Sequence, residues 1–151
     1  MNRTTVITGT LALGLALGWS LRESQWASAQ GKLIPSSTVN IADVKMEPHL
    51  DSGKPVGEAG LLVDGETAGT KSMQVGRFLL PPGMQPHPPH RHVAEEVLIV
   101  TRGSGEIVCD GKTVAVKPGA VMFSEPSVEH GIKNTGDRPL EFYWVKYQPR
   151  N

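Results

Sequence analysis

Short runs of strand-forming residues, separated by turn residues, recur at regular intervals along most of this 151-residue chain. The runs cover residues 60–63, 71–80, 96–101, 105–109, 112–116, 121–124, 131–134 and 140–147. Asp110-Gly111 lies between two of them and is the strongest signal for a two-residue hairpin. Regular spacing of this kind is typical of an antiparallel sandwich or barrel. Because no ten-residue stretch after Ala29 has a helical apolar period, we predict a single all-β domain.

The first 29 residues differ in composition from the rest of the chain. Arg3 is followed by an uncharged, leucine-rich stretch at 4–21, and Ala27 and Ala29 form a small-x-small cleavage site. This pattern predicts a signal peptide at 1–29 that is cut between Ala29 and Gln30, which makes the protein periplasmic or secreted. The alternative is an uncleaved membrane anchor at 4–21, because that stretch reaches the lower end of spanning length. A membrane is a partner only in the second case.

The remaining residues divide into an N-terminal wrap at 30–59 and the barrel at 60–151. The wrap is polar, and we expect a short extended segment at 38–44 and a surface position for His49. The chain has 15 Lys+Arg and 15 Asp+Glu with no long basic run, which argues against a nucleic-acid partner. Cys109 is the only cysteine, so neither an intramolecular disulfide nor a Cys-rich zinc site can form.

Three histidines and one glutamate form a pattern of candidate metal ligands. His90 and His92 flank one residue, so on an extended segment both imidazoles point to the same face. Glu96 follows four residues later, and His130 lies near a second strand pair that could bring a fourth ligand across a barrel. Imidazole and carboxylate together suit a divalent metal. The alternative is surface histidines without a ligand, and His87 in the neighbouring proline segment is either a rim residue or exposed.

The histidine pattern has two halves. Gly83 precedes His90 and Gly103 closes the first half, while Pro126, His130 and Asn134 form the second. Over residues 71–147 the chain resembles the cupin family, with one extra residue between the first glycine and the first histidine. The resemblance implies a double-stranded β-helix, or jelly-roll barrel, whose open end holds a metal on these residues: His90, His92, Glu96 and His130. It favours Mn or Fe, although the ligand types also accept Zn, Cu, Ni or Co.

The fold and the metal site leave the reaction open, because one fold hosts many functions. One hypothesis is a metal-dependent enzyme, dioxygenase-, isomerase- or lyase-like, acting on a small organic molecule, with its catalytic residues unassigned. The other is a metal-bearing protein that binds a small molecule without catalysis. The strand at 140–147 alternates, with Phe142, Trp144 and Lys146 on one face and Tyr143 on the other. We expect this aromatic strand to pack in the core or to form a homodimer surface near Trp144.

Overall fold

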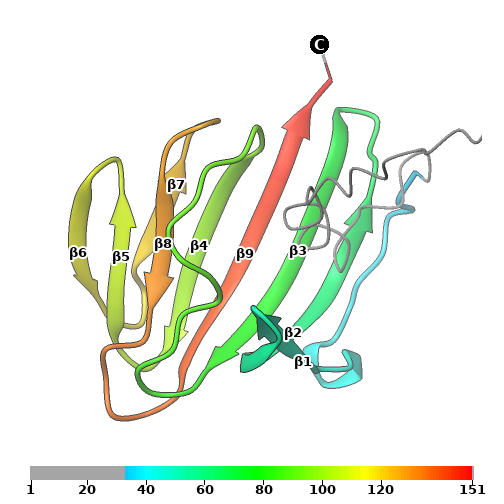
Figure 1. The fold of residues 1–151 in the computed structure, drawn as a ribbon. Coiled ribbons are helices and arrows are strands. Elements are labelled where there is room, and N and C mark those ends of the chain that lie inside the picture. Colours follow the sequence, from blue (N-terminus) through cyan, green and yellow to red (C-terminus); the bar gives the residue numbers. More distant parts are fainter. Residues whose placement is uncertain (1–32, 151) are drawn as a thin grey trace, which may run out of the picture.

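The computed structural model describes residues 33–150, so the predicted signal segment and the alternative anchor lie outside the described residues. Within 33–150, nine strands form two antiparallel sheets that face each other (Figure 1). The larger sheet has the order β1-β2-β3-β9-β4-β7 and the smaller one β6-β5-β8. This arrangement confirms the predicted all-β jelly-roll fold. The strands are β1 (Glu47–Asp51), β2 (Lys54–Gly65), β3 (Thr70–Leu80), β4 (Glu95–Arg102), β5 (Gly105–Cys109), β6 (Lys112–Val116), β7 (Val121–Ser124), β8 (His130–Lys133) and β9 (Leu140–Pro149).

Each of the eight expected strands is present, with ends that differ by a few residues. Asp110 and Gly111 both have positive φ, 49° and 71°, which is the conformation of the predicted two-residue hairpin between β5 and β6. The residues 33–150 contain no helix that is long and apolar enough to cross a membrane.

The N-terminal part of the described chain differs from expectation. The segment at 38–44 was expected to be extended, but it contains a short 3-10 helix, Ile41–Asp43, beside which Asn40 Nδ2 lies 3.4 Å from Asp43 Oδ2. Strand β1 was not expected, because its sequence contains a proline and little apolar alternation. It forms because Ser52 and Gly53, with φ of 53° and 78°, turn the chain back so that β1 pairs with β2. Polar segments of this kind take the structure that a neighbouring strand edge or a local hydrogen bond provides.

The register of the larger sheet places one set of side chains inside the barrel. Trp144 on β9 lies opposite Gly76 on β3 and Leu98 on β4, and opposite residues of an antiparallel pair share a face. Leu98 is buried, so this face is the inner one. A Cβ on Gly76 would overlap the Trp144 ring, so the indole occupies the space above the glycine. The Trp144 side chain packs against the core, which is the first of the two roles expected for this strand, and the homodimer stays a prediction.

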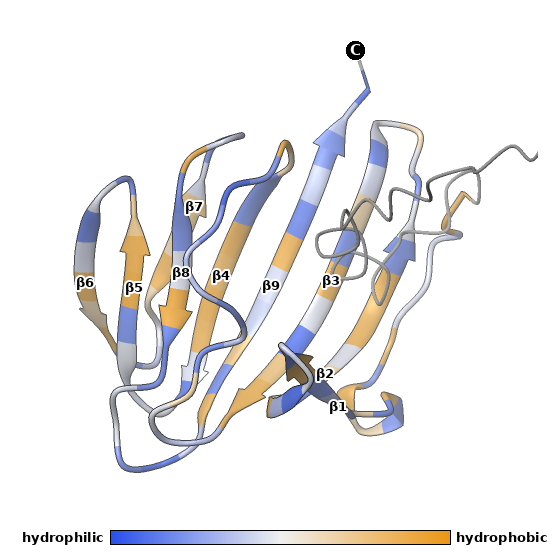
Figure 2. Ribbon diagram, in the orientation of Figure 1, coloured by the Kyte–Doolittle hydropathy of each residue, from blue (hydrophilic) through white to orange (hydrophobic). Residues whose placement is uncertain are grey.

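The two ends of the barrel interior differ in polarity. Leu80 and Leu140 have no exposed surface and close one end together with Phe78 and Phe142, whose rings stack at 5.5 Å. Toward the other end the inner face of β9 becomes polar, and Figure 2 shows hydrophilic residues in the C-terminal part of that strand and at the adjoining start of β4. The closed end supplies the buried apolar surface that stabilises the domain. The open end is free to carry polar groups.

Asn134, at the closed end, has a structural role. Its side chain is fully buried, and Nδ2 donates to the carbonyl oxygens of Leu80 at 2.9 Å and Arg138 at 2.8 Å. Its Oδ1 accepts a hydrogen bond from the backbone N–H of Gly136. This one amide thus joins the end of β3 to the turn between β8 and β9.

Candidate metal centre

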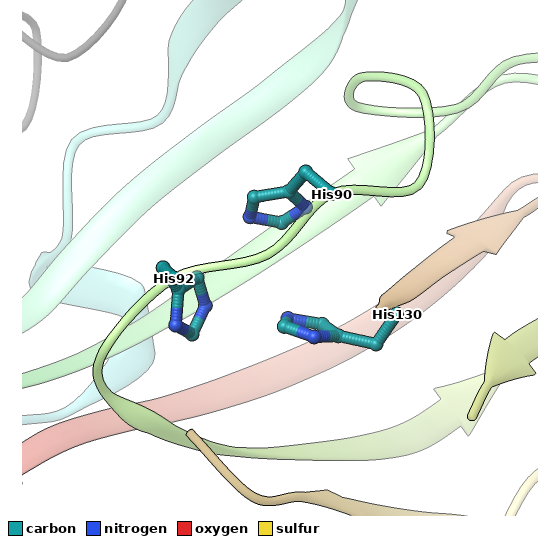
Figure 3. Close-up of side chains that lie close together, drawn as sticks. All are labelled: His90, His92 and His130. Atoms are coloured by element: carbon teal, nitrogen blue, oxygen red, sulfur yellow. The ribbon is translucent and has the colours of Figure 1, made fainter. Parts of the chain in front are cut away.

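Two segments far apart in the sequence meet at the open end of the barrel. His90 and His92 lie between β3 and β4, and His130 begins β8. The backbone N–H of His90 donates to the carbonyl of His130, and that of His130 donates to the carbonyl of His90, both at 3.0 Å. This backbone pair holds the proline-rich segment against β8 and sets the two imidazoles opposite each other (Figure 3).

The three imidazoles converge. One nitrogen from each of His90, His92 and His130 lies within 4.8 Å of the others, and Figure 3 shows the three rings turned toward a common centre. Glu96, at the start of β4, places Oε2 at 2.8 Å from His92 Nε2 and at 3.6 Å from His130 Nε2. The structure therefore brings together all four residues that the sequence proposes as metal ligands.

Hydrogen bonds on the far side of two rings fix which nitrogen faces the centre. His92 Nδ1 donates to the carbonyl of Ala94 at 2.9 Å, and His130 Nδ1 donates to that of Val128, also at 2.9 Å. With Nδ1 protonated, each Nε2 carries a lone pair directed at the centre. Such bonds to carbonyl oxygens are the usual way in which a protein orients metal-binding imidazoles.

The charges of the group favour a cation. Burial lowers the pKa of His90 to about 3, with the neighbouring histidines adding to the effect, so this imidazole is neutral at pH 7. Burial pushes the pKa of Glu96 upward, but its interactions with His130 and His92 outweigh burial and bring it to about 2. Burial also opposes protonation of His130, but Glu96 and the Val128 carbonyl outweigh it and raise that pKa. A bound cation would replace the proton that Glu96 attracts to this nitrogen.

The donor set fits a divalent transition metal. Among the described residues, His130 Nε2 and His90 Nδ1 are buried without a hydrogen-bond partner, which is costly unless something else satisfies them. Three imidazole nitrogens and one carboxylate oxygen match the ligand preferences of Mn, Fe, Co, Ni, Cu and Zn. His90, His92, Glu96 and His130 are thus the residues that would hold such an ion.

Of the other two histidines, one lies beside this group. His87 packs edge-on against His90, with ring centroids 4.0 Å apart, and its Nδ1 donates to the Pro88 carbonyl at 3.0 Å, so it is half-buried beside the histidine group. His49 was expected on the surface, but it is half-buried and packs edge-on against Phe78 at 5.0 Å. The reason is strand β1, which the sequence did not indicate and which pairs with β2.

A small pocket of about 190 Å³ shares His92 with the histidine group. Pockets for drug-sized ligands are about 300–1,000 Å³, so this one suits a smaller molecule. Sequence reasoning did not assign its polar walls to the site, although the alternation of β9 already placed Lys146 on the face of Phe142 and Trp144. The described residues that line it are Ser72, Gln74, His92, Val93, Ala94, Lys146 and Gln148.

Comparison with known proteins identifies the fold and a relative. The family model for the cupin domain matches residues 76–146. An oxalate-binding protein from Thermotoga maritima is 34% identical over 98 residues, which cover 64% of this chain and 80% of the relative.

Solved structures agree with the fold. The crystal structure of a predicted oxalate decarboxylase from Thermotoga maritima has a TM-score of 0.60 and 25% identity, covering 74% of this chain and 99% of the other. An RmlC-like cupin from Shewanella frigidimarina also has a TM-score of 0.60, with 17% identity and coverage of 78% and 95%. The latter supports the fold alone. The jelly-roll barrel, the histidine pattern and these matches together show that the chain belongs to the cupin family.

Proposed function

We propose that this protein binds Mn or Fe at its histidine group and acts, as a metal-dependent lyase, on a small carboxylate of the oxalate type. The observation that carries the proposal is the convergence of three imidazole nitrogens, two of them facing Glu96, beside a pocket of about 190 Å³. The relatives described as an oxalate-binding protein and a predicted oxalate decarboxylase support the choice of ligand.

In this proposal the metal ligands and the residues of the pocket wall have different roles. A bound divalent ion would polarise a carboxylate oxygen of the ligand. His92 and His130 are kept in the correct tautomer by the carbonyls of Ala94 and Val128. Val93 and Ala94 add apolar surface to the pocket wall, and the small volume limits the length of the ligand.

A second candidate is a protein that binds a small carboxylate without converting it. It is favoured by one observation: of the described residues that line the pocket, none is an Asp or Glu that could act as an acid or base outside the metal ligands. Elemental analysis of purified protein, followed by titration with oxalate and a search for formate and carbon dioxide, separates the two. Binding with product supports the lyase, binding without product supports the second candidate, and no binding contradicts both.

The leader pattern supports a further part of the proposal, action outside the cytoplasm. The uncharged stretch at 4–21 and the small residues at Ala27 and Ala29 are the basis for it. Mass spectrometry of the protein from an exporting host should give a chain that starts at Gln30. An intact Met1 in the membrane fraction would instead support the anchor.

A further inference from the structure

A row of polar side chains crosses the inner face of the larger sheet at the open end of the barrel. In register order these are Asp64 on β2, Gln74 on β3, Lys146 on β9, Glu96 on β4 and Ser124 on β7. Each is directly opposite the next, so all five share one face. The row lies two residues along from the row that contains Trp144 and Leu98, and thus it borders the apolar core on one side and the mouth on the other.

Most members of the row are engaged with each other or with the histidine group. Gln74 Nε2 donates to Asp64 Oδ1 at 3.1 Å. Glu96 lies against His92 and His130, and Ser124 Oγ is 3.1 Å from His130 Nδ1. The two carboxylates of the row, Asp64 and Glu96, are therefore engaged with Gln74 and with the histidine group.

Lys146 is the exception. It is half-buried between Gln74 and Glu96, and it forms no ion pair with any residue of 33–150. Glu96, directly opposite Lys146 on β4, lies against His92 and His130, so Lys146 is a neighbour of the histidine group. A half-buried cation without an internal counterion is suited to recognising an anion.

The pocket beside Lys146 has the matching chemistry. Ser72 and Gln148 are opposite each other on β3 and β9, and they line the pocket together with Lys146 and His92. A hydroxyl, an amide and an ammonium group can all donate hydrogen bonds to a carboxylate. Because His92 belongs to both the pocket and the histidine group, an anion in the pocket lies beside the metal centre.

We propose that Lys146 binds the second carboxylate of the ligand, so that the site selects small dicarboxylates over monocarboxylates. The first carboxylate lies toward the histidine group, and Ser72 and Gln148 complete the wall around the second. This inference rests on the proposed function, because it assumes that the ligand is a carboxylate at this centre. It adds to that function the residue that makes the site prefer a ligand with two carboxylates.

Calorimetric titration of oxalate and of acetate into Mn²⁺-loaded protein tests the proposal with Lys146→Met. A hydrogen bond to a charged group contributes about 1.5–3 kcal/mol, so the variant should bind oxalate about 10- to 100-fold more weakly than wild type. Its acetate affinity and its metal content should stay unchanged. Lys71→Met is the matched control, because it removes the same charge from an exposed position on β3 and should bind oxalate like wild type.

Lys146→Arg is a second variant that keeps the positive charge and should retain most of the oxalate affinity. Lys146→Met that carries a full complement of metal and binds oxalate like wild type would overturn the inference while leaving the proposed function intact. So would an Arg variant that is folded and metal-loaded but as weak as the Met variant. If wild type itself binds no oxalate, the proposed function fails and the role of Lys146 fails with it.

Discussion

Replacing Glu96 by Gln tests whether the carboxylate is a metal ligand and leaves the barrel intact. The Glu96 side chain is 12% exposed, and its Oε2 lies 2.8 Å from His92 Nε2. Glutamine has nearly the same shape but no charge, so the variant removes the anionic ligand without opening a cavity. Glu95→Gln is the matched control, because Glu95 is the neighbouring residue on β4, and its side chain interacts with Tyr147 on the opposite face.

The size of the effect follows from mass action. A metal present at a hundredfold excess over its dissociation constant stabilises the folded protein by about 2.7 kcal/mol. For a domain of this size that corresponds to roughly 10 °C in melting temperature. Changes to residues that only orient metal ligands already cost about 10- to 100-fold in affinity. A hundredfold weaker affinity at the same metal concentration would leave about 0.4 kcal/mol of stabilisation, or roughly 2 °C.

The assay compares melting temperatures with metal and with chelator for each variant, together with metal content by elemental analysis. Comparing each variant with itself cancels any change that the substitution makes to the metal-free fold. Wild type and Glu95→Gln should lose roughly 10 °C on chelation, and Glu96→Gln should lose roughly 2 °C. His92→Ala and His130→Ala should behave like Glu96→Gln, because each of them removes one nitrogen from the same centre.

Two outcomes would refute the reasoning. Glu96→Gln with the metal content and chelator response of wild type would show that the carboxylate is not a ligand. A His130→Ala variant that kept its metal while His92→Ala lost it would place the ion on the segment at 90–96 alone.

Two further predictions concern the outer face of the barrel. We expect a homodimer formed through the outer side of β4 and β7, where Ile99, Val121 and Phe123 are 36%, 66% and 53% exposed. Light scattering at micromolar concentration should show a dimer for wild type and a monomer for Phe123→Glu. A monomeric wild type would contradict this prediction. Burial raises the pKa of Glu141, but the hydrogen bonds from Arg77 and Thr101 outweigh it and hold that pKa below its usual range. The ionised carboxylate therefore stabilises the fold above the pKa of the unfolded chain, and the benefit is lost as the pH falls through the folded pKa. Urea unfolding should show Glu141→Gln to be less stable than wild type by about 1 kcal/mol at neutral pH and nearly equal in strong acid, whereas a pH-independent difference would assign the loss to packing.

Local patterns in the sequence were sufficient for the fold class and for most strands. Alternation along 71–80 and the turn at Asp110-Gly111 depend only on neighbouring residues, and the structure has both. Strand β1 was missed because its residues have no clear alternation of their own. It becomes a strand only because the edge of β2 offers backbone hydrogen bonds.

The candidate metal residues could be proposed from spacing alone, since the alternation of side chains along an extended segment puts His90 and His92 on one face. The sequence by itself thus determined the ligand types and the side of the strand on which they lie. Only the tertiary structure decided that His130 pairs with His90 through the backbone and that Lys146 lies between Gln74 and Glu96. The physical reason is that strand register is set by contacts between residues far apart in the chain, and a shift of one residue would turn every inner side chain of β9 to the outer face.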